Sequence, residues 1–183
     1  MGFAALMLIF LFFFPIWKIS LIAPQYPQGI SMYIWINKIT GETPGTLQNI
    51  NILNHYVGMK LIEPDSIPEL GYFQFIIIGM GVLALFFAWL DRKPLYLAWT
   101  ILFVILGILA IYDFYLWEYD YGHNLSPTAP IKVPGMAYQP PLFGKKTLLN
   151  FVAYSYPSFG SLFFGLSIVF GFIAFWLSKK KIK

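Results

Sequence analysis

The sequence contains no cysteine and few charged residues. The absence of cysteine excludes disulfides, thiolate metal sites and thiol nucleophiles together. Charged residues make up 11% of the 183 residues, whereas 58% are hydrophobic and 20% aromatic, and the mean hydropathy is +0.68. An average soluble domain carries about 25% charged residues. This composition therefore indicates a membrane protein.

Several functional classes leave no motif in the sequence. It has no glycine-rich phosphate loop after a strand, no HExxH motif and no recognisable Ser-His-Asp context. The net charge is only +4, and the lysines and arginines lie beside apolar segments instead of forming a basic stripe with interleaved aromatics. We therefore expect no nucleic-acid partner, no catalytic residues and no enzyme that acts alone.

Four apolar stretches approach the roughly 20 residues that a helix needs to cross a bilayer. They cover residues 3–22, 71–90, 95–117 and 159–177. The first resembles a signal-peptide core, but it lacks a basic start and a small-x-small cleavage site, so we interpret it as a retained anchor. The sequence thus predicts an all-α membrane protein, one domain over residues 1–183, with four transmembrane helices and two long outer-face loop segments containing short helices.

Positive charge beside the spans predicts their orientation. It is densest at Arg92 and Lys93, in the short turn between two spans, and in the C-terminal tail, at Lys179, Lys180, Lys181 and Lys183. Short segments rich in lysine and arginine stay in the cytoplasm. We expect a bacterial inner-membrane protein with both termini cytoplasmic and with residues 23–70 and 118–158 on the outer face.

The outer segments contain three local patterns. Residues 31–39, SMYIWINKI, are typical of a strand or of an interfacial stretch. Residues 47–62 have apolar side chains at helical spacing and predict a helix with Thr46 as its N-cap. Residues 145–158, KKTLLNFVAYSYPS, predict a short amphipathic helix on the membrane surface.

Candidate metal ligands occur in both outer segments: His55, Met59, His123 and Met136. On the predicted helix, His55 and Met59 are four residues apart and would share one face. Imidazole and thioether donors without thiolates suit Cu(I), whereas histidine with carboxylates would suit zinc or non-haem iron. A copper site requires the two outer segments to fold together. The alternative is that the pair consists of a surface histidine beside a packing methionine.

Three carboxylates lie close to His123 in the sequence: Asp113, Glu118 and Asp120. They could orient a ligating histidine from the second coordination layer. Asp113 is the acid closest to an apolar span, and such a residue usually faces the bundle or a wet cavity. The alternative for Asp113 is a carboxylate at a helix end that accepts a hydrogen bond from a neighbouring aromatic side chain, with Trp117 beside it.

A resemblance covers most of the chain and is strongest in the outer segments. It is carried by the runs DFYLWEYDYGHNL, SPTAPIKVPGMAYQPPLFGKK, LLNFVAYSYP, PQYPQGISMYIWINKITG and NINILNHYVGMK. These runs resemble small bacterial four-span membrane proteins associated with nitrous oxide reductase maturation and copper delivery outside the cytoplasm. That family has no established activity. The resemblance implies an accessory role in copper handling, with a periplasmic copper chaperone or nitrous oxide reductase as partner.

The sequence therefore predicts an integral membrane accessory protein for periplasmic copper handling, with copper as its cofactor. Two alternatives stay open. One is a non-catalytic scaffolding subunit whose outer loops dock a periplasmic or membrane partner through aromatics such as Trp35 and Trp117. The other is a quinone- or metal-dependent oxidoreductase subunit that uses Asp113.

Overall fold

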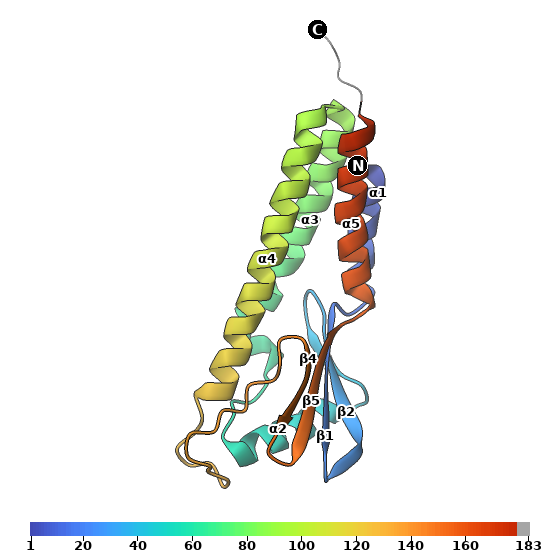
Figure 1. Ribbon diagram of the computed structural model, residues 1–183. Coiled ribbons are helices and arrows are strands. Elements are labelled where there is room, and N and C mark those ends of the chain that lie inside the picture. Colours follow the sequence, from blue (N-terminus) through green and yellow to red (C-terminus); the bar gives the residue numbers. More distant parts are fainter. Residues whose placement is uncertain (179–183) are drawn as a thin grey trace.

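The protein is a mixed α/β molecule, with its long helices at one end and a five-stranded antiparallel sheet at the other (Figure 1). The computed structural model describes residues 1–178. Along the chain the elements are α1 (Gly2–Phe10), β1 (Trp17–Ala23), β2 (Tyr26–Ile34), β3 (Ile39–Gly41), α2 (Thr46–Val57), the 3₁₀ turn η1 (Pro64–Ser66), α3 (Pro68–Leu90), α4 (Lys93–His123), β4 (Gly144–Leu148), β5 (Phe151–Pro157) and α5 (Phe159–Leu177). The predicted all-α fold is therefore wrong.

Three helices in the described part of the chain are long and apolar enough to cross a membrane, namely α3, α4 and α5. Helix α1 has nine residues, a rise of about 13 Å against a hydrocarbon core of about 30 Å. The predicted span over residues 3–22 is thus wrong. Pro15 disfavours helix at and before its position, and the alternating WKISLIA that follows is a strand pattern, which a hydropathy window averages away.

Close contacts between α4 and α5 show how the two helices are aligned along their length. Gly107 of α4 lies against the Phe164 ring, and Gly171 of α5 lies against Thr100. These contacts align two antiparallel helices, so that about eleven residues of α4 continue beyond the first residue of α5. We call this segment, residues 113–123, the α4 extension. The α4 extension runs beside the sheet, whereas the rest of α4 runs beside the other long helices (Figure 1).

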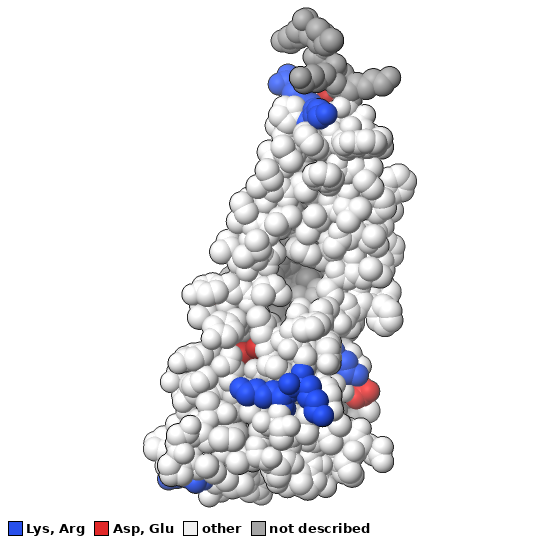
Figure 2. Space-filling view, viewed as in Figure 1, with Lys and Arg blue, Asp and Glu red and all other residues white. Residues whose placement is uncertain are grey.

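The surface of the three long helices is apolar and largely uncovered. Phe75 is 66% exposed, Trp89 77% and Trp176 73%. Figure 2 shows a broad belt without charged side chains between the turn that joins α3 to α4 and the charged sheet end. Apolar patches of this extent are rare on soluble monomers and suit contact with lipid.

The α3–α4 turn, with Arg92 and Lys93, lies at the end of the helices farthest from the sheet (Figure 1). If this turn is cytoplasmic, the sheet is on the outer face. The lysine tail on which the orientation also rests, residues 179–183, lies outside the described residues. The inner-membrane location with both termini cytoplasmic therefore stays a prediction.

The sheet has the strand order β3-β2-β1-β5-β4, with β1 in the centre. Strand β1 pairs with β2 through Lys18 and Tyr33, and with β5 through Lys18 and Tyr156. The strand alternative for residues 31–39 is correct for the part within β2. The predicted surface helix over residues 145–158 is wrong, because these residues form the β4–β5 hairpin. Their alternating aromatic and small residues suit a strand.

One face of the sheet is covered by α2 and the α4 extension. Ile19 and Met32 point from this face into a buried cluster with Ile50 of α2 and Tyr121 of the α4 extension. A separate apolar cluster around Trp99 holds the helices together. The molecule thus has two apolar layers, and α4 runs through both.

Candidate functional site

Helix α2 ends earlier than expected, and this separates His55 from Met59. Gly58 adopts φ 82°, and the Met59 N–H donates to the Asn54 carbonyl at 2.9 Å, which terminates the helix at Val57. Met59 therefore lies beyond the helix, and the predicted shared face is wrong.

Thr46 is the first helical residue and Gly45 precedes it as the cap, one position from the predicted N-cap.

The two segments that carry the predicted ligands do fold together. The Ser126 N–H donates to the Gly58 carbonyl at 2.7 Å, and the Ile131 N–H donates to the Tyr56 carbonyl at 2.9 Å. The Lys60 ammonium pairs with the Asp120 carboxylate at 2.5 Å. The loop after α4 is thus held against the end of α2, as a site shared by the two segments requires.

The four predicted ligands occupy two kinds of environment in this region, which we call the His/Met region. Met59 and Met136 both pack against one apolar cluster that includes Tyr138. His55 and His123 are exposed, and the His123 ring stacks on Tyr119 with ring centroids 3.9 Å apart. Among the described residues, no group of three or more histidines and carboxylates could hold a metal ion. Copper binding here stays a prediction.

None of the three predicted second-layer carboxylates hydrogen-bonds to a histidine within residues 1–178. Asp120 pairs with Lys60 and also accepts a hydrogen bond from Asn124. Asp113 and Glu118 lie elsewhere along α4, in two separate environments. Those environments are the more distinctive features of the structure.

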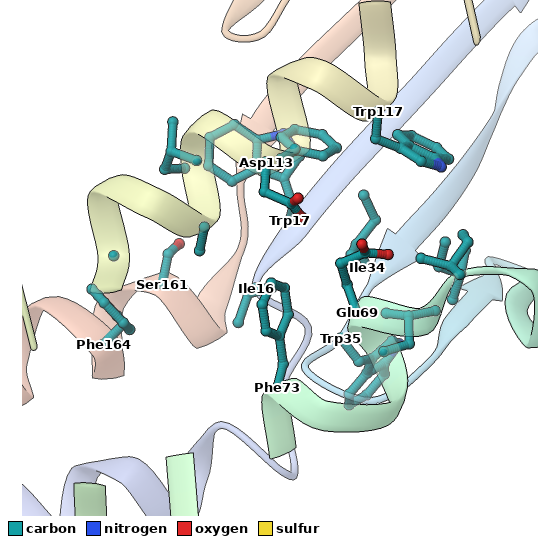
Figure 3. Close-up of a pocket in the computed structure, with 17 residues that line it drawn as sticks. Ile16, Trp17, Ile34, Trp35, Glu69, Phe73, Asp113, Trp117, Ser161 and Phe164 are labelled. Atoms are coloured by element: carbon teal, nitrogen blue, oxygen red, sulfur yellow. The ribbon is translucent and has the colours of Figure 1, made fainter. Parts of the chain in front are cut away.

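An apolar pocket of about 250 Å³ lies where α3, α4 and α5 meet the sheet, and we call it the boundary pocket (Figure 3). Its volume exceeds that of the roughly 150 Å³ apolar cavity that binds benzene. Figure 2 shows a hollow in the surface between α4 and α5 at this level. The pocket is lined mainly by apolar and aromatic side chains, among them Ile16, Trp17, Ile34, Trp35, Leu70, Phe73, Ala110, Phe114, Trp117 and Phe164.

Hydrogen bonds hold two of the three indoles of this pocket in place. The Trp17 Nε1–H donates to Ser155 Oγ at 2.7 Å, and the Trp35 Nε1–H donates to Thr40 Oγ1 at 2.9 Å. Because both N–H groups are engaged with the sheet, their rings form a preorganised aromatic wall. The third indole, Trp117, comes from the α4 extension.

Two carboxylates, Glu69 and Asp113, also line the boundary pocket. Glu69 stands in the first turn of α3 and Asp113 begins the α4 extension. Both are half-buried, and neither makes a hydrogen bond or ion pair with any other described residue. The two are close enough to interact electrostatically. The expectation that Asp113 faces a cavity is confirmed, and the alternative of a hydrogen bond to a neighbouring ring is wrong.

Sequence reasoning missed Glu69. It lies two residues before the predicted span over residues 71–90, directly after Pro68. Proline at the start of a helix followed by an acidic residue is a usual signature of the first turn. That signature predicts a helix start, but it does not predict that the carboxylate turns toward Asp113.

Glu118 is the second distinctive acid of α4. It is 0% exposed, and neither carboxylate oxygen has a hydrogen-bond partner among the described residues. It belongs to the α4 extension, beyond the part of α4 that packs along α5. Burial raises the pKa of Glu118 to about 8, although the nearby Lys146 ammonium acts in the opposite direction. The buried hydroxyl of Tyr138 is likewise unpartnered within residues 1–178.

Comparison of the chain with protein-family models, curated proteins and solved structures gives no match. The resemblance to proteins associated with nitrous oxide reductase maturation therefore stays a prediction.

Proposed function

We propose that the protein is a membrane-anchored, non-catalytic binding protein that holds an amphiphilic small molecule in the boundary pocket. The observation that carries this proposal is a mainly apolar cavity of about 250 Å³ at the level where three span-length helices meet the sheet. Small-molecule sites are typically concave and apolar with a few polar groups. This pocket combines an aromatic wall with two carboxylates.

The position of the pocket supports an amphiphile over a water-soluble ligand. Its bundle side is formed by residues such as Ala110 and Phe164, whereas its sheet side carries Glu69 and Asp113. A molecule with an apolar chain and a polar head would match this division. Its chain would lie at the depth of the uncharged belt and its head at the depth of the sheet.

The test is a variant that fills the pocket. Ala110→Phe adds a ring inside the lining, whereas Ile108→Phe adds the same ring on the exposed side of α4, where Ile108 is 63% exposed. Native mass spectrometry of each protein, released from nonionic micelles, measures retained amphiphile. We expect Ala110→Phe to lose most of the adduct that the parent and Ile108→Phe retain. Equal retention by all three proteins would contradict the proposal.

A second candidate function is Cu(I) binding in the His/Met region. The observation that favours it is the pair of backbone hydrogen bonds that join residues 126 and 131 to the end of α2, together with the shared packing of Met59 and Met136. Thioether and imidazole donors suit Cu(I). The protein would then belong to periplasmic copper handling, with a copper chaperone or nitrous oxide reductase as partner.

Metal analysis under reducing conditions tests this second candidate. We expect the parent to retain Cu(I) and the His55→Ala/His123→Ala double variant to lose it. A control is Lys132→Ala, which changes an exposed residue of the same loop. If the double variant binds Cu(I) as tightly as the parent, these histidines are not ligands.

A further inference from the structure

The polar residues of the boundary pocket indicate which headgroup its ligand carries. This inference rests on the proposed function. A lipid chain gains little free energy when it leaves the bilayer for an apolar pocket, because lipid tails are as apolar as the side chains that line it. Selection among amphiphiles therefore depends on the polar groups of the pocket. Those with charge are Glu69 and Asp113.

No cationic side chain stands among the described lining residues beside these two carboxylates, although the Lys38 ammonium lies over the ring of the lining residue Trp35, 4.7 Å from its centroid. The described lining contains no lysine, arginine or histidine. Lys18 follows the pocket residue Trp17, but successive residues of a strand point to opposite faces. The Lys18 ammonium lies over the Tyr33 ring, 5.2 Å from its centroid, on the face of the sheet away from the pocket. The pocket thus has a local excess of negative charge.

The aromatic wall favours the same kind of ligand. Trp17, Trp35 and Trp117 line the same pocket as the two carboxylates (Figure 3). The faces of indole rings attract cations, quaternary ammonium groups among them, and the Lys38 ammonium over the Trp35 ring shows that contact within this wall. An anionic headgroup would be repelled by both carboxylates, and a neutral one would leave them unpaired.

We propose that the boundary pocket selects an amphiphile with a cationic, ammonium-type headgroup, which lies between Glu69 and Asp113 against the indoles. The apolar chain extends toward Ala110 and Phe164 and leaves through the hollow between α4 and α5 (Figure 2). The distance along α4 from Asp113 back to Gly107 is about 9 Å, so the pocket holds the headgroup and the first part of the chain.

Three probes with the same dodecyl chain test the headgroup: dodecyltrimethylammonium, dodecanol and dodecanoate. Binding to the full chain in nonionic micelles is measured by isothermal titration calorimetry. We expect the ammonium probe to bind about tenfold tighter than dodecanol, and dodecanoate to bind most weakly. Tighter binding of dodecanoate, or equal binding of all three, would overturn the inference.

Two double variants separate a local effect from a change in net charge. Glu69→Gln/Asp113→Asn removes both pocket carboxylates, whereas Glu63→Gln/Asp65→Asn removes two exposed carboxylates nearby. We expect the first to lose about tenfold in affinity for the ammonium probe and to keep its affinity for dodecanol. The second should bind both probes as the parent does. An equal loss in both double variants would overturn the inference.

The filled-pocket variant distinguishes failure of the headgroup inference from failure of the proposed function. If Ala110→Phe abolishes binding of all probes while the parent does not discriminate among headgroups, the pocket binds amphiphiles and only the headgroup inference is wrong. If the parent binds none of the probes, or Ala110→Phe leaves every affinity unchanged, the proposed function and the inference both fail.

Discussion

The two sides of the α4 extension each carry an acidic residue, and these two residues differ in how accessible they are. On one side Asp113 is half-buried in the boundary pocket, without a hydrogen bond to any described residue. On the other side Glu118, five residues later in the chain, is completely buried, and both its oxygens lack partners within residues 1–178. A ligand can reach Asp113, but Glu118 is sealed.

The difference between the two sides comes from what packs against the helix. At Gly122, one turn after Glu118, a Cβ atom would lie 2.3 Å from the backbone of Gln139. The Tyr138 N–H also donates to the Gly122 carbonyl at 2.9 Å. The loop is therefore pressed directly onto this side of α4. We infer that the sealed side contributes to stability and the pocket side to binding.

The largest effect is expected where the loop meets α4. Gly122→Leu places a side chain where the Gln139 backbone lies, so the loop must move away from the helix, at a cost of about 3 kcal/mol. Thermal unfolding in nonionic micelles measures this loss. Gly71→Leu is the matched control, because Gly71 is exposed on α3 and a Cβ there meets nothing within 4 Å. Equal unfolding temperatures would show that the loop is not closely packed on α4.

Glu118 should make the stability of the parent protein depend on pH. Its pKa is raised from 4.5 in the unfolded chain to about 8 in the folded protein. The folded state then binds more protons between these values, so the contribution of Glu118 is most favourable below pH 4.5 and is lost as pH rises through 8. We expect the loss to reach a few kcal/mol.

Glu118→Gln tests the origin of this pH dependence, because the amide keeps the size of the side chain and cannot ionise. Between pH 5 and pH 9, the unfolding temperature should fall more steeply with rising pH in the parent than in the variant. The two proteins should be similar at pH 5, and the variant should be more stable at pH 9. Identical slopes would show that Glu118 does not titrate in this range.

The helices were more predictable from the sequence than the sheet. The span over residues 159–177 coincides with α5 and the span over residues 71–90 lies within α3, because hydropathy over a long window is a strong signal. Hydropathy alone extends the predicted span over residues 3–22 into strand β1, since the apolar residues of β1 continue the run of α1. Here Pro15 and the period of two were the informative signals.

The candidate site was predictable only in part. The sequence singles out Asp113 as an acid that faces the bundle or a cavity, with Trp117 beside it, and both residues line the pocket. Glu69 comes from another helix, and Trp17 and Trp35 come from strands. Their meeting depends on the pairing of β1 with β2, which the predicted helix over residues 3–22 did not allow.

A crossed pair of substitutions on α4 gives a smaller effect on each measurement. Asp113→Asn should weaken binding of dodecyltrimethylammonium several-fold and change the unfolding free energy by less than about 0.5 kcal/mol. At pH 5, where the Glu118 carboxyl is protonated, Glu118→Ala leaves a cavity on the sealed side and should cost about 2 kcal/mol while the affinity stays unchanged. Calorimetry and thermal unfolding of both variants provide the comparison. If each substitution altered both quantities equally, the two sides of α4 would not be independent.

The smallest effect is expected at Asp120, which is two residues beyond Glu118 yet exposed to solvent. Its carboxylate pairs with Lys60 at 2.5 Å, with the side chains 50% exposed for Lys60 and 39% for Asp120. Exposed ion pairs contribute about 0.2–1 kcal/mol and weaken as salt is added. Asp120→Asn should therefore lower the unfolding free energy by less than 1 kcal/mol, and the difference from the parent should shrink in high salt. A loss as large as that of Glu118→Ala, or one insensitive to salt, would mean that Asp120 holds the α2 end against α4 by packing and not by charge.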